Sequence, residues 1–209
     1  MRKHGFTLIE VMVAMGVFSI VSLLGFIAIR STYESQSLIA AQSEAQRELR
    51  DVMSTLTTDL ELAYAPPKAQ SVINPEGVEP ISLAPDGRSV RFYRPIPDAS
   101  IQGFTWTGPI TFLFEHEDTD DNALLDPGED ANSDGMLTRR IVRQIGDVAT
   151  PVGGANNLSA VEFELLENAA SNDNRTTRLR IRLEATVRYG PGNGLIARQE
   201  LESEIQFLN

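Results

Sequence analysis

Residues 6–29 read FTLIEVMVAMGVFSIVSLLGFIAI, a run of 24 residues that are nearly all apolar or small. The run carries a single charge, at Glu10. At about 1.5 Å rise per residue, a helix of this length crosses a hydrocarbon core of roughly 30 Å. The stretch therefore predicts a transmembrane helix near the N-terminus, and the rest of the fold must begin where this helix leaves the membrane.

A secretory signal peptide and an ordinary signal anchor both account less well for this apolar run. A signal peptide has an apolar region of about 7 to 15 residues that ends at a small-residue cleavage site. This run is longer and has no such site. A signal anchor leaves unexplained why the run starts with the order GFTLIE at residues 5–10. Arg2 and Lys3 precede the run and only Arg30 follows it closely, so we expect a cytoplasmic N-terminus and a single pass.

The first 15 residues, MRKHG followed by FTLIEVMVAM, resemble the N-terminal signature of the type IV pilin and type II secretion pseudopilin superfamily. In that family a prepilin peptidase cuts after the glycine on the cytoplasmic side and methylates the new N-terminus. The resemblance implies a leader of residues 1–5, a cut between Gly5 and Phe6, N-methylation of Phe6 and a role in assembly for Glu10. It also implies a pilin-like fold, a place in the bacterial inner membrane, and two kinds of further partner: other pilin or pseudopilin subunits and an inner-membrane assembly platform.

A carboxylate in a spanning helix costs a few kcal/mol to insert, so Glu10 is expected to have a partner or a function. Cleavage would turn Phe6 into a free amine, one helical turn away on the same chain or present on a neighbouring subunit. In a low dielectric this pair attracts far more strongly than in water and would set the stagger between adjacent helices. The competing interpretation is that Glu10 only reaches back to the cytoplasmic interface.

Helical periodicity continues beyond the membrane span. Apolar residues recur at helical spacing, and charged residues occupy the rest of the wheel. The apolar positions are Ala45, Leu49, Val52, Met53, Leu56 and Leu60. Pro66-Pro67 ends the pattern. We predict one helix from about Phe6 to Tyr64, of which residues 6–29 span the membrane and residues 30–65 are amphipathic and pack on a globular domain of residues 66–209.

Short alternating segments separated by glycine and proline indicate that residues 66–209 are rich in strands. The candidates are Ser89–Arg94, Ile110–Glu115, Leu137–Gln144, Ala160–Leu165 and a C-terminal hairpin that begins with Thr177–Tyr189. Arginines alternate with apolar residues on the first hairpin strand and glutamates do so on the second, which suits cross-strand pairing that sets the register. A long helix on an antiparallel sheet is an α+β arrangement, as in the pilin-like fold implied by the resemblance.

Acidity is concentrated in one segment. Nine acids and no Lys or Arg lie between Glu115 and Asp134, which leaves 20 acids and 18 basic residues elsewhere. Positions 1, 3, 5, 7, 9 and 12 of a calcium-loop pattern are occupied by Asp118, Asp120, Asn122, Leu124, Asp126 and Glu129. Ala123 stands where the pattern has glycine, and Pro127 disfavours a following helix. The pattern therefore predicts an EF-hand-like loop between two strands.

A second, less complete register of the same pattern follows at once. Its candidate ligands are Asp130, Asn132, Asp134, Met136 and Thr138, with Ile141 in place of the closing glutamate. It is either a site of its own or half of a shared site. A solvated acidic loop is the alternative, but the acids alternate with Asn, Gly and apolar residues as a cation site requires. We expect structural Ca²⁺ here rather than Mg²⁺, which tolerates crowded protein cages poorly.

Composition narrows the possible functions. The absence of cysteine excludes thiol chemistry and a disulfide framework, and nucleic-acid binding is disfavoured because no basic face remains. No nucleophile–base pattern is visible, so we expect no enzyme. The favoured function is a minor pilin or pseudopilin that resembles the J-type subunit of type II secretion or the W-type subunit of type IV pili. The alternative is a membrane-anchored, calcium-dependent adhesin or binding module.

Overall fold

The computed structural model describes residues 7–63, 81–98, 103–106, 108–120, 122, 124–154, 156–167, 177–190, 192 and 194–207. Within these residues one helix precedes ten strands. Their bounds are α1 Leu8–Glu61, β1 Ile81–Leu83, β2 Ser89–Phe92, β3 Pro95–Asp98, β4 Gly103–Trp106, β5 Ile110–Glu115, β6 Arg140–Ile145, β7 Val148–Pro151, β8 Leu158–Glu167, β9 Thr177–Tyr189 and β10 Leu195–Gln206.

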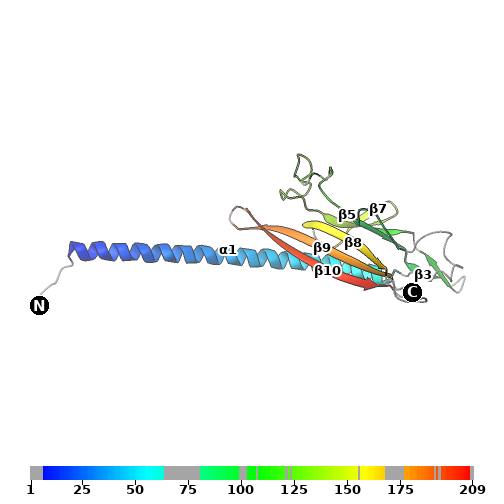
Figure 1. Ribbon diagram of the computed structural model, residues 1–209, viewed down its shortest axis with the longest axis horizontal. Coiled ribbons are helices and arrows are strands. Elements are labelled where there is room, and N and C mark those ends of the chain that lie inside the picture. Colours follow the sequence, from blue (N-terminus) through cyan, green and yellow to red (C-terminus); the bar gives the residue numbers. More distant parts are fainter. Residues whose placement is uncertain are drawn as a thin grey trace.

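Helix α1 has 54 residues and two different halves. Its first half is exposed on all sides, and the first buried residue is Ala41. From there the buried positions follow helical spacing, as the apolar periodicity predicted, through Leu49, Val52 and Leu56 to Leu60. Figure 1 shows the first half of α1 projecting far beyond the strands. The helix ends at Glu61, with Leu62 as its C-cap, slightly before the predicted end near Tyr64.

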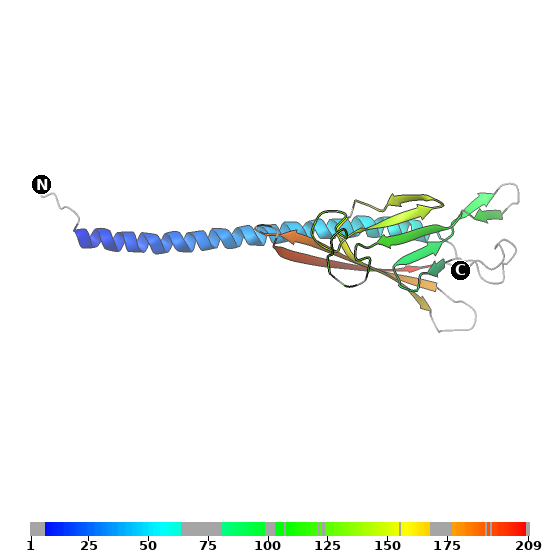
Figure 2. The ribbon, with the colours of Figure 1, turned by 90° about the horizontal axis from the view of Figure 1, so that it is seen from above.

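The strands form antiparallel sheets around the second half of α1 (Figure 2). One sheet has the order β1-β2-β5-β6-β7, a second has the order β10-β9-β8, and β3 pairs with β4. Helix α1 packs on β9 and β10. The inner faces of both larger sheets and the buried stripe of α1 share one hydrophobic core, which includes Phe112, Phe163 and Ile181. The predicted α+β architecture is confirmed.

Close packing against the helix also involves the segment after β7. Gly153 has φ +65°, and a Cβ built there would lie 3.2 Å from Cγ2 of Val52 and 3.4 Å from its backbone nitrogen. Glycine is thus required both for the backbone conformation and for the close approach to α1. Val152, its neighbour, is 2% exposed and belongs to the core.

The strand expected at Ala160–Leu165 is longer in the structure, at Leu158–Glu167, and two other predicted strands also have different bounds. The segment expected at Ser89–Arg94 ends at Phe92, and the one expected at Leu137–Gln144 begins at Arg140. The second prediction was wrong at its start because the Thr138 hydroxyl donates to Asp134 Oδ2 and holds this part of the chain in the preceding loop. Strands β1, β3, β4 and β7 were not predicted. β7 is exposed along its whole length and β3 contains two prolines, so neither shows the alternation of a half-buried strand.

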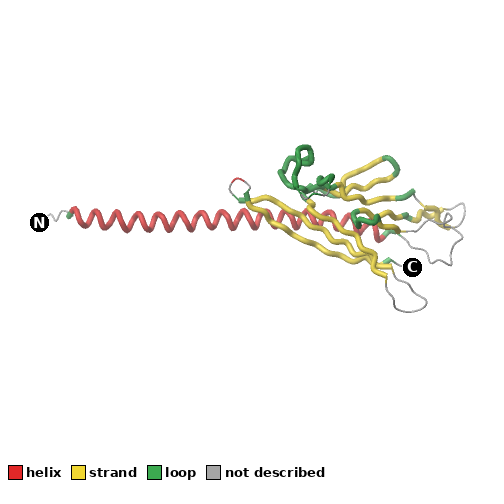
Figure 3. The backbone as a smooth tube through the Cα atoms, turned by 45° about the horizontal axis from the view of Figure 1, so that its top comes forward, coloured by secondary structure: helices red, strands yellow, loops and turns green. Residues whose placement is uncertain are grey.

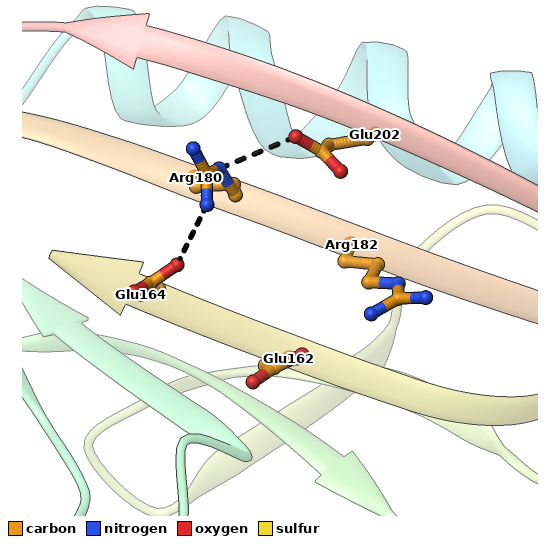
Figure 4. A pocket seen from close by; sticks show the side chains of 5 residues that line it. All are labelled: Glu162, Glu164, Arg180, Arg182 and Glu202. Atoms are coloured by element: carbon orange, nitrogen blue, oxygen red, sulfur yellow. Dashed lines mark hydrogen bonds and ion pairs between the residues drawn. The ribbon is translucent and has the colours of Figure 1, made fainter. Parts of the chain in front are cut away.

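The C-terminal hairpin pairs as its sequence predicted. Arg180 lies opposite Glu204 on β10 and opposite Glu164 on β8. Its guanidinium forms ion pairs of 3.0 Å with Glu164, 3.2 Å with Glu202 and 3.1 Å with Glu204, and Figure 4 shows it between the first two. A surface pocket here is lined by residues that include these ion-paired groups: Glu162, Glu164, Arg180, Arg182 and Glu202. Because the pairs are solvent-exposed, they fix the register of the three strands more than they stabilise them.

A half-buried acid in the helix–sheet contact gives a pH-dependent prediction. Asn157 Nδ2 donates to both carboxylate oxygens of Glu48, at 3.3 and 3.1 Å. Burial raises the pKa of Glu48 despite these hydrogen bonds, and the charges of Glu44 and Asp51 raise it further. A raised folded-state pKa means that this carboxyl favours folding below its ordinary pKa of about 4.3 and opposes it as pH rises through the folded value.

Glu48→Gln should therefore stabilise the detergent-solubilised chain at pH 7, because glutamine keeps an acceptor for Asn157 without the buried charge. We expect the Tm to rise by about 1 to 3 °C. The difference should disappear near pH 4, where the wild-type carboxyl is protonated. Glu44→Gln on the exposed side of α1 is the control and should change Tm less. A Glu48→Gln protein that melts at or below the wild-type temperature at pH 7 would contradict this account.

Candidate metal centre and helix terminus

The start of α1 is organised by a capping box. Thr7 is the N-cap, and its hydroxyl oxygen accepts a hydrogen bond of 3.3 Å from the Glu10 backbone N–H. In return, Glu10 Oε2 accepts from the Thr7 backbone N–H at 2.8 Å and from its hydroxyl at 3.0 Å. The Glu10 carboxylate is thus turned back toward the chain before the helix. Gly5 and Phe6 lie outside the described residues.

The same helix is long and apolar enough to cross a membrane. Its most apolar window of 18 residues has a mean hydropathy of 2.5 and none of it is buried inside the protein. Large side chains such as Leu8, Phe18 and Phe26 are 64–81% exposed. An apolar helix left bare in this way is not the core helix of a soluble domain, in which most of these side chains would be covered.

The acidic segment connects β5 to β6 and forms two successive loops, drawn in green in Figure 3, which project from the body of strands. In the first loop, carboxylate oxygens of Asp118, Asp120 and Glu129 all lie within 4.8 Å of one another. The Asn122 backbone N–H donates to Asp118 Oδ1 at 3.0 Å and to Asp120 Oδ1 at 3.2 Å. The Leu124 backbone N–H donates to Asn122 Oδ1 at 2.6 Å.

Glu129, the residue in the closing position, is tied into the first loop. Its Oε1 accepts from the Thr119 backbone N–H and hydroxyl, both at 2.8 Å, and its Oε2 accepts from the Asp126 backbone N–H at 3.1 Å. These hydrogen bonds, those from Thr119 first, lower the pKa of Glu129. The other predicted ligand, Asp126, accepts from Asn122 Nδ2 at 2.8 Å. The first loop therefore already favours an ionised carboxylate at the position where a cation would need it.

The second loop repeats this hydrogen-bond pattern twelve residues later. The Asp134 backbone N–H donates to Asp130 Oδ1 at 2.9 Å and to Asn132 Oδ1 at 3.1 Å. The Met136 backbone N–H donates to Asp134 Oδ1 at 2.7 Å. Gly135 provides the turn with φ +70°. Asp130, Asn132 and Asp134 therefore have the same local geometry as their counterparts in the first register.

Contacts on two sides attach the second loop to the sheet β10-β9-β8. Asn132 Nδ2 donates to the Asn156 carbonyl at 3.0 Å, and Arg188 Nη2 donates to the Gly135 carbonyl at 2.5 Å. Arg139 and Leu158 exchange backbone hydrogen bonds of 2.8 and 2.9 Å, which form an isolated bridge. The second loop thus contacts the sheet β10-β9-β8 and leads directly into β6 of the five-stranded sheet.

Glu117, which the sequence pattern did not single out, lies beside the acids of the second loop. Carboxylate oxygens of Glu117, Asp130 and Asp134 lie within 4.8 Å of one another. Glu117 precedes the first register and lies thirteen residues before Asp130, so the loop pattern assigns it no position. Ile141, which holds the closing position of the second register, is fully buried on β6 in the core. Burial is the main cause that raises the pKa of Glu117, against hydrogen bonds from the backbone of Asn132 and Ala131.

Comparisons with known proteins find similarity in the N-terminal part of the chain, where the capping box and the apolar helix lie. Residues 1–26 match the family model of the prokaryotic N-terminal methylation motif. The chain is also 43% identical over 63 residues to the pilin-like protein PilA3 of Thermus thermophilus.

The chain is therefore similar to pilin-like proteins that begin with the prokaryotic methylation motif. The aligned segment is 30% of this chain and 27% of PilA3, so the chain spans about a quarter of that relative's length. No solved structure matches the chain. The family-model match covers residues 1–26, and the strand-rich body is described by its own structure.

Proposed function

We propose that the chain is a minor pilin or pseudopilin, a non-catalytic subunit that is cut after Gly5, N-methylated at Phe6 and assembled through α1 into a type IV pilus or a type II secretion pseudopilus. The observation that carries the proposal is the bare apolar half of α1 behind a prepilin-type start. Exposure of this apolar surface to water costs roughly 25 cal/mol per Å². Lipid would cover it before assembly, and the helices of neighbouring subunits would cover it afterwards.

The capping box fits this proposal. Thr7 becomes the second residue of the mature chain, and Glu10 is already turned toward it. A free amine on Phe6 would then lie one residue from the group that the carboxylate contacts. Pairing of the two charges, within one chain or between neighbours, would compensate the cost of an acid in a low-dielectric helix bundle. In the cell, the partners would be the prepilin peptidase, other pilin subunits and the assembly platform of the bacterial inner membrane, with the body of strands outside the cytoplasm.

We also propose that the first acidic loop holds a structural Ca²⁺. Asp118, Asp120, Asn122, Asp126 and Glu129 would supply side-chain oxygens, and Leu124 would supply its backbone carbonyl. This is an all-oxygen set of the size that Ca²⁺ takes. Three of its carboxylates lie close together, and a divalent cation would relieve their mutual repulsion. The ion would order the connection between β5 and β6 and would take no part in catalysis.

The cleavage proposal is tested by replacing Gly5. In cells that contain a prepilin peptidase, Gly5→Val should leave the precursor uncut, so that mass spectrometry of membrane-extracted protein finds the mass of the intact chain. The wild-type protein should lack residues 1–5 and carry one methyl group on Phe6. Gly16→Ala within the membrane span is the control and should be processed normally. A Gly5→Val protein that is cut and methylated like the wild type would refute the processing proposal.

The calcium proposal predicts a ligand-dependent stability. For the full chain in detergent, Ca²⁺ at 100 times its Kd should add about 2.7 kcal/mol to the free energy of unfolding. That corresponds to a rise of about 5 to 10 °C in Tm. Asp118→Ala should reduce the rise, whereas Glu200→Ala on the exposed face of β10 should not. An equal Tm with Ca²⁺ and with chelator, in both the wild type and Asp118→Ala, would remove calcium from the description of the first loop.

A further inference from the structure

Glu117 has a side chain that is almost completely enclosed. The side chain is 2% exposed, although it follows directly after the end of β5 and belongs to a highly acidic stretch. Acids are rarely buried to this degree unless a charge or a metal compensates them. Glu117 therefore requires a compensating cation or a full set of hydrogen-bond donors.

The two carboxylate oxygens of Glu117 have different surroundings. Oε1 accepts hydrogen bonds from the backbone N–H groups of Ala131 at 2.9 Å and Asn132 at 3.2 Å. These donors hold the carboxylate against the start of the second loop. Oε2 is buried and has no hydrogen-bond partner among the described residues. A buried acceptor without a partner costs roughly 1 to 3 kcal/mol, and more when it carries a charge.

The charges that the structure places near Glu117 do not provide the missing partner. Two further carboxylates, those of Asp130 and Asp134, lie within 4.8 Å of Glu117 and add negative charge. The Arg139 guanidinium is 3.6 Å from Glu117 Oε1, on the oxygen that is already satisfied, and it is also 3.7 Å from Glu115. Arg139 is therefore shared, it faces a cluster of three carboxylates, and Oε2 still lacks a donor within the described part of the chain.

We propose that Glu117 is the closing carboxylate of a second Ca²⁺ site, in which Asp130, Asn132, Asp134, the Met136 carbonyl and Thr138 supply the other ligands. The inference rests on the proposed calcium role of the acidic segment and adds to it a ligand and a second ion. Glu117 takes the part that Glu129 plays in the first loop. Ile141 cannot take it, because its side chain belongs to the core. Six oxygen-donating residues meet the requirement of a hard cation, and Oε2 gains a partner of opposite charge.

A second ion in this place would act as a clamp between the sheets. Glu117 continues from β5 in the five-stranded sheet, whereas the second loop is held to the other large sheet through Asn156, Leu158 and Arg188. Calcium bound between Glu117 and the second loop would therefore connect the two sheets. The first loop has a different position, since the hydrogen bonds that organise it lie within the acidic segment itself.

The test counts bound ions. The full chain in detergent is treated with chelator, dialysed against Ca²⁺ and examined by native mass spectrometry and by equilibrium dialysis with the metal alone. The wild-type chain should bind two ions. Glu117→Gln should bind one, with a Kd for the second ion raised by about tenfold or more, because the site loses one negative ligand. Glutamine keeps an oxygen that can accept from Ala131 and Asn132, so the loop should still fold.

Three other variants complete the design. Asp134→Asn removes a carboxylate from the same cluster and should also bind one ion, whereas Glu129→Gln should lose the ion of the first loop and keep the one at Glu117. Glu48→Gln makes the same change at a half-buried acid outside both loops, and it should keep two ions. Circular dichroism of each variant in chelator should match the wild type.

Three results would overturn the proposal. Glu117→Gln with two ions at wild-type affinity would show that Glu117 is no ligand. A wild-type chain that binds one ion, lost in Glu129→Gln but kept in Glu117→Gln, would show that the first loop alone binds calcium. A wild-type chain that binds no ion would refute both calcium proposals. The assignment to a filament is tested separately by the processing of Gly5→Val.

Discussion

The structure depends on one constraint, the unequal covering of a single continuous helix. The second half of α1 buries a stripe from Ala41 to Leu60 against the strands, so it is held by the hydrophobic effect within the chain. The first half has apolar residues around its whole circumference, and no other part of the described chain buries it. Because the helix is not interrupted, burial in the body fixes the direction in which the uncovered half projects. The body thus positions an apolar surface that lipid or another subunit would have to bury.

A second constraint on the body is electrostatic: carboxylates that are close in sequence must be accommodated in one region. Nine acids lie from the end of β5 through the loops that lead to β6, in an otherwise nearly neutral chain. The two loops arrange them differently. In the first loop, backbone and hydroxyl donors stabilise the ionised form of Glu129, and its pKa falls. In the second, burial disfavours the ionised form of Glu117, and its pKa rises. The two glutamates are both buried, and they acquire different proton affinities because hydrogen bonds from Thr119 dominate at Glu129 whereas desolvation dominates at Glu117.

Features that depend on neighbouring residues in the chain were predictable. The buried stripe of α1 follows from a period that the sequence displays, and the pairing of β9 with β10 follows from two long alternating strands and a glycine-rich turn. The two acidic loops were predictable from ligand spacing. Features that depend on contacts between distant segments were not. β7 has no buried side and shows no alternation, and Glu117 becomes a neighbour of Asp134 only because the second loop folds back over the end of β5.

The two proposed activities of the chain occupy separate parts of the structure. Glu10 is in the first turn of α1, whose bare half projects from the body, and both acidic loops lie on the body of strands (Figure 1). A cation in the loops would therefore act on assembly only through the integrity of the body, since α1 is held by β9 and β10. The proposed clamp at Glu117 would add a second connection between the five-stranded sheet and the sheet that carries α1, which already share one hydrophobic core. Loss of that link would loosen the body while the helix start, whose capping box is entirely local, would remain unchanged.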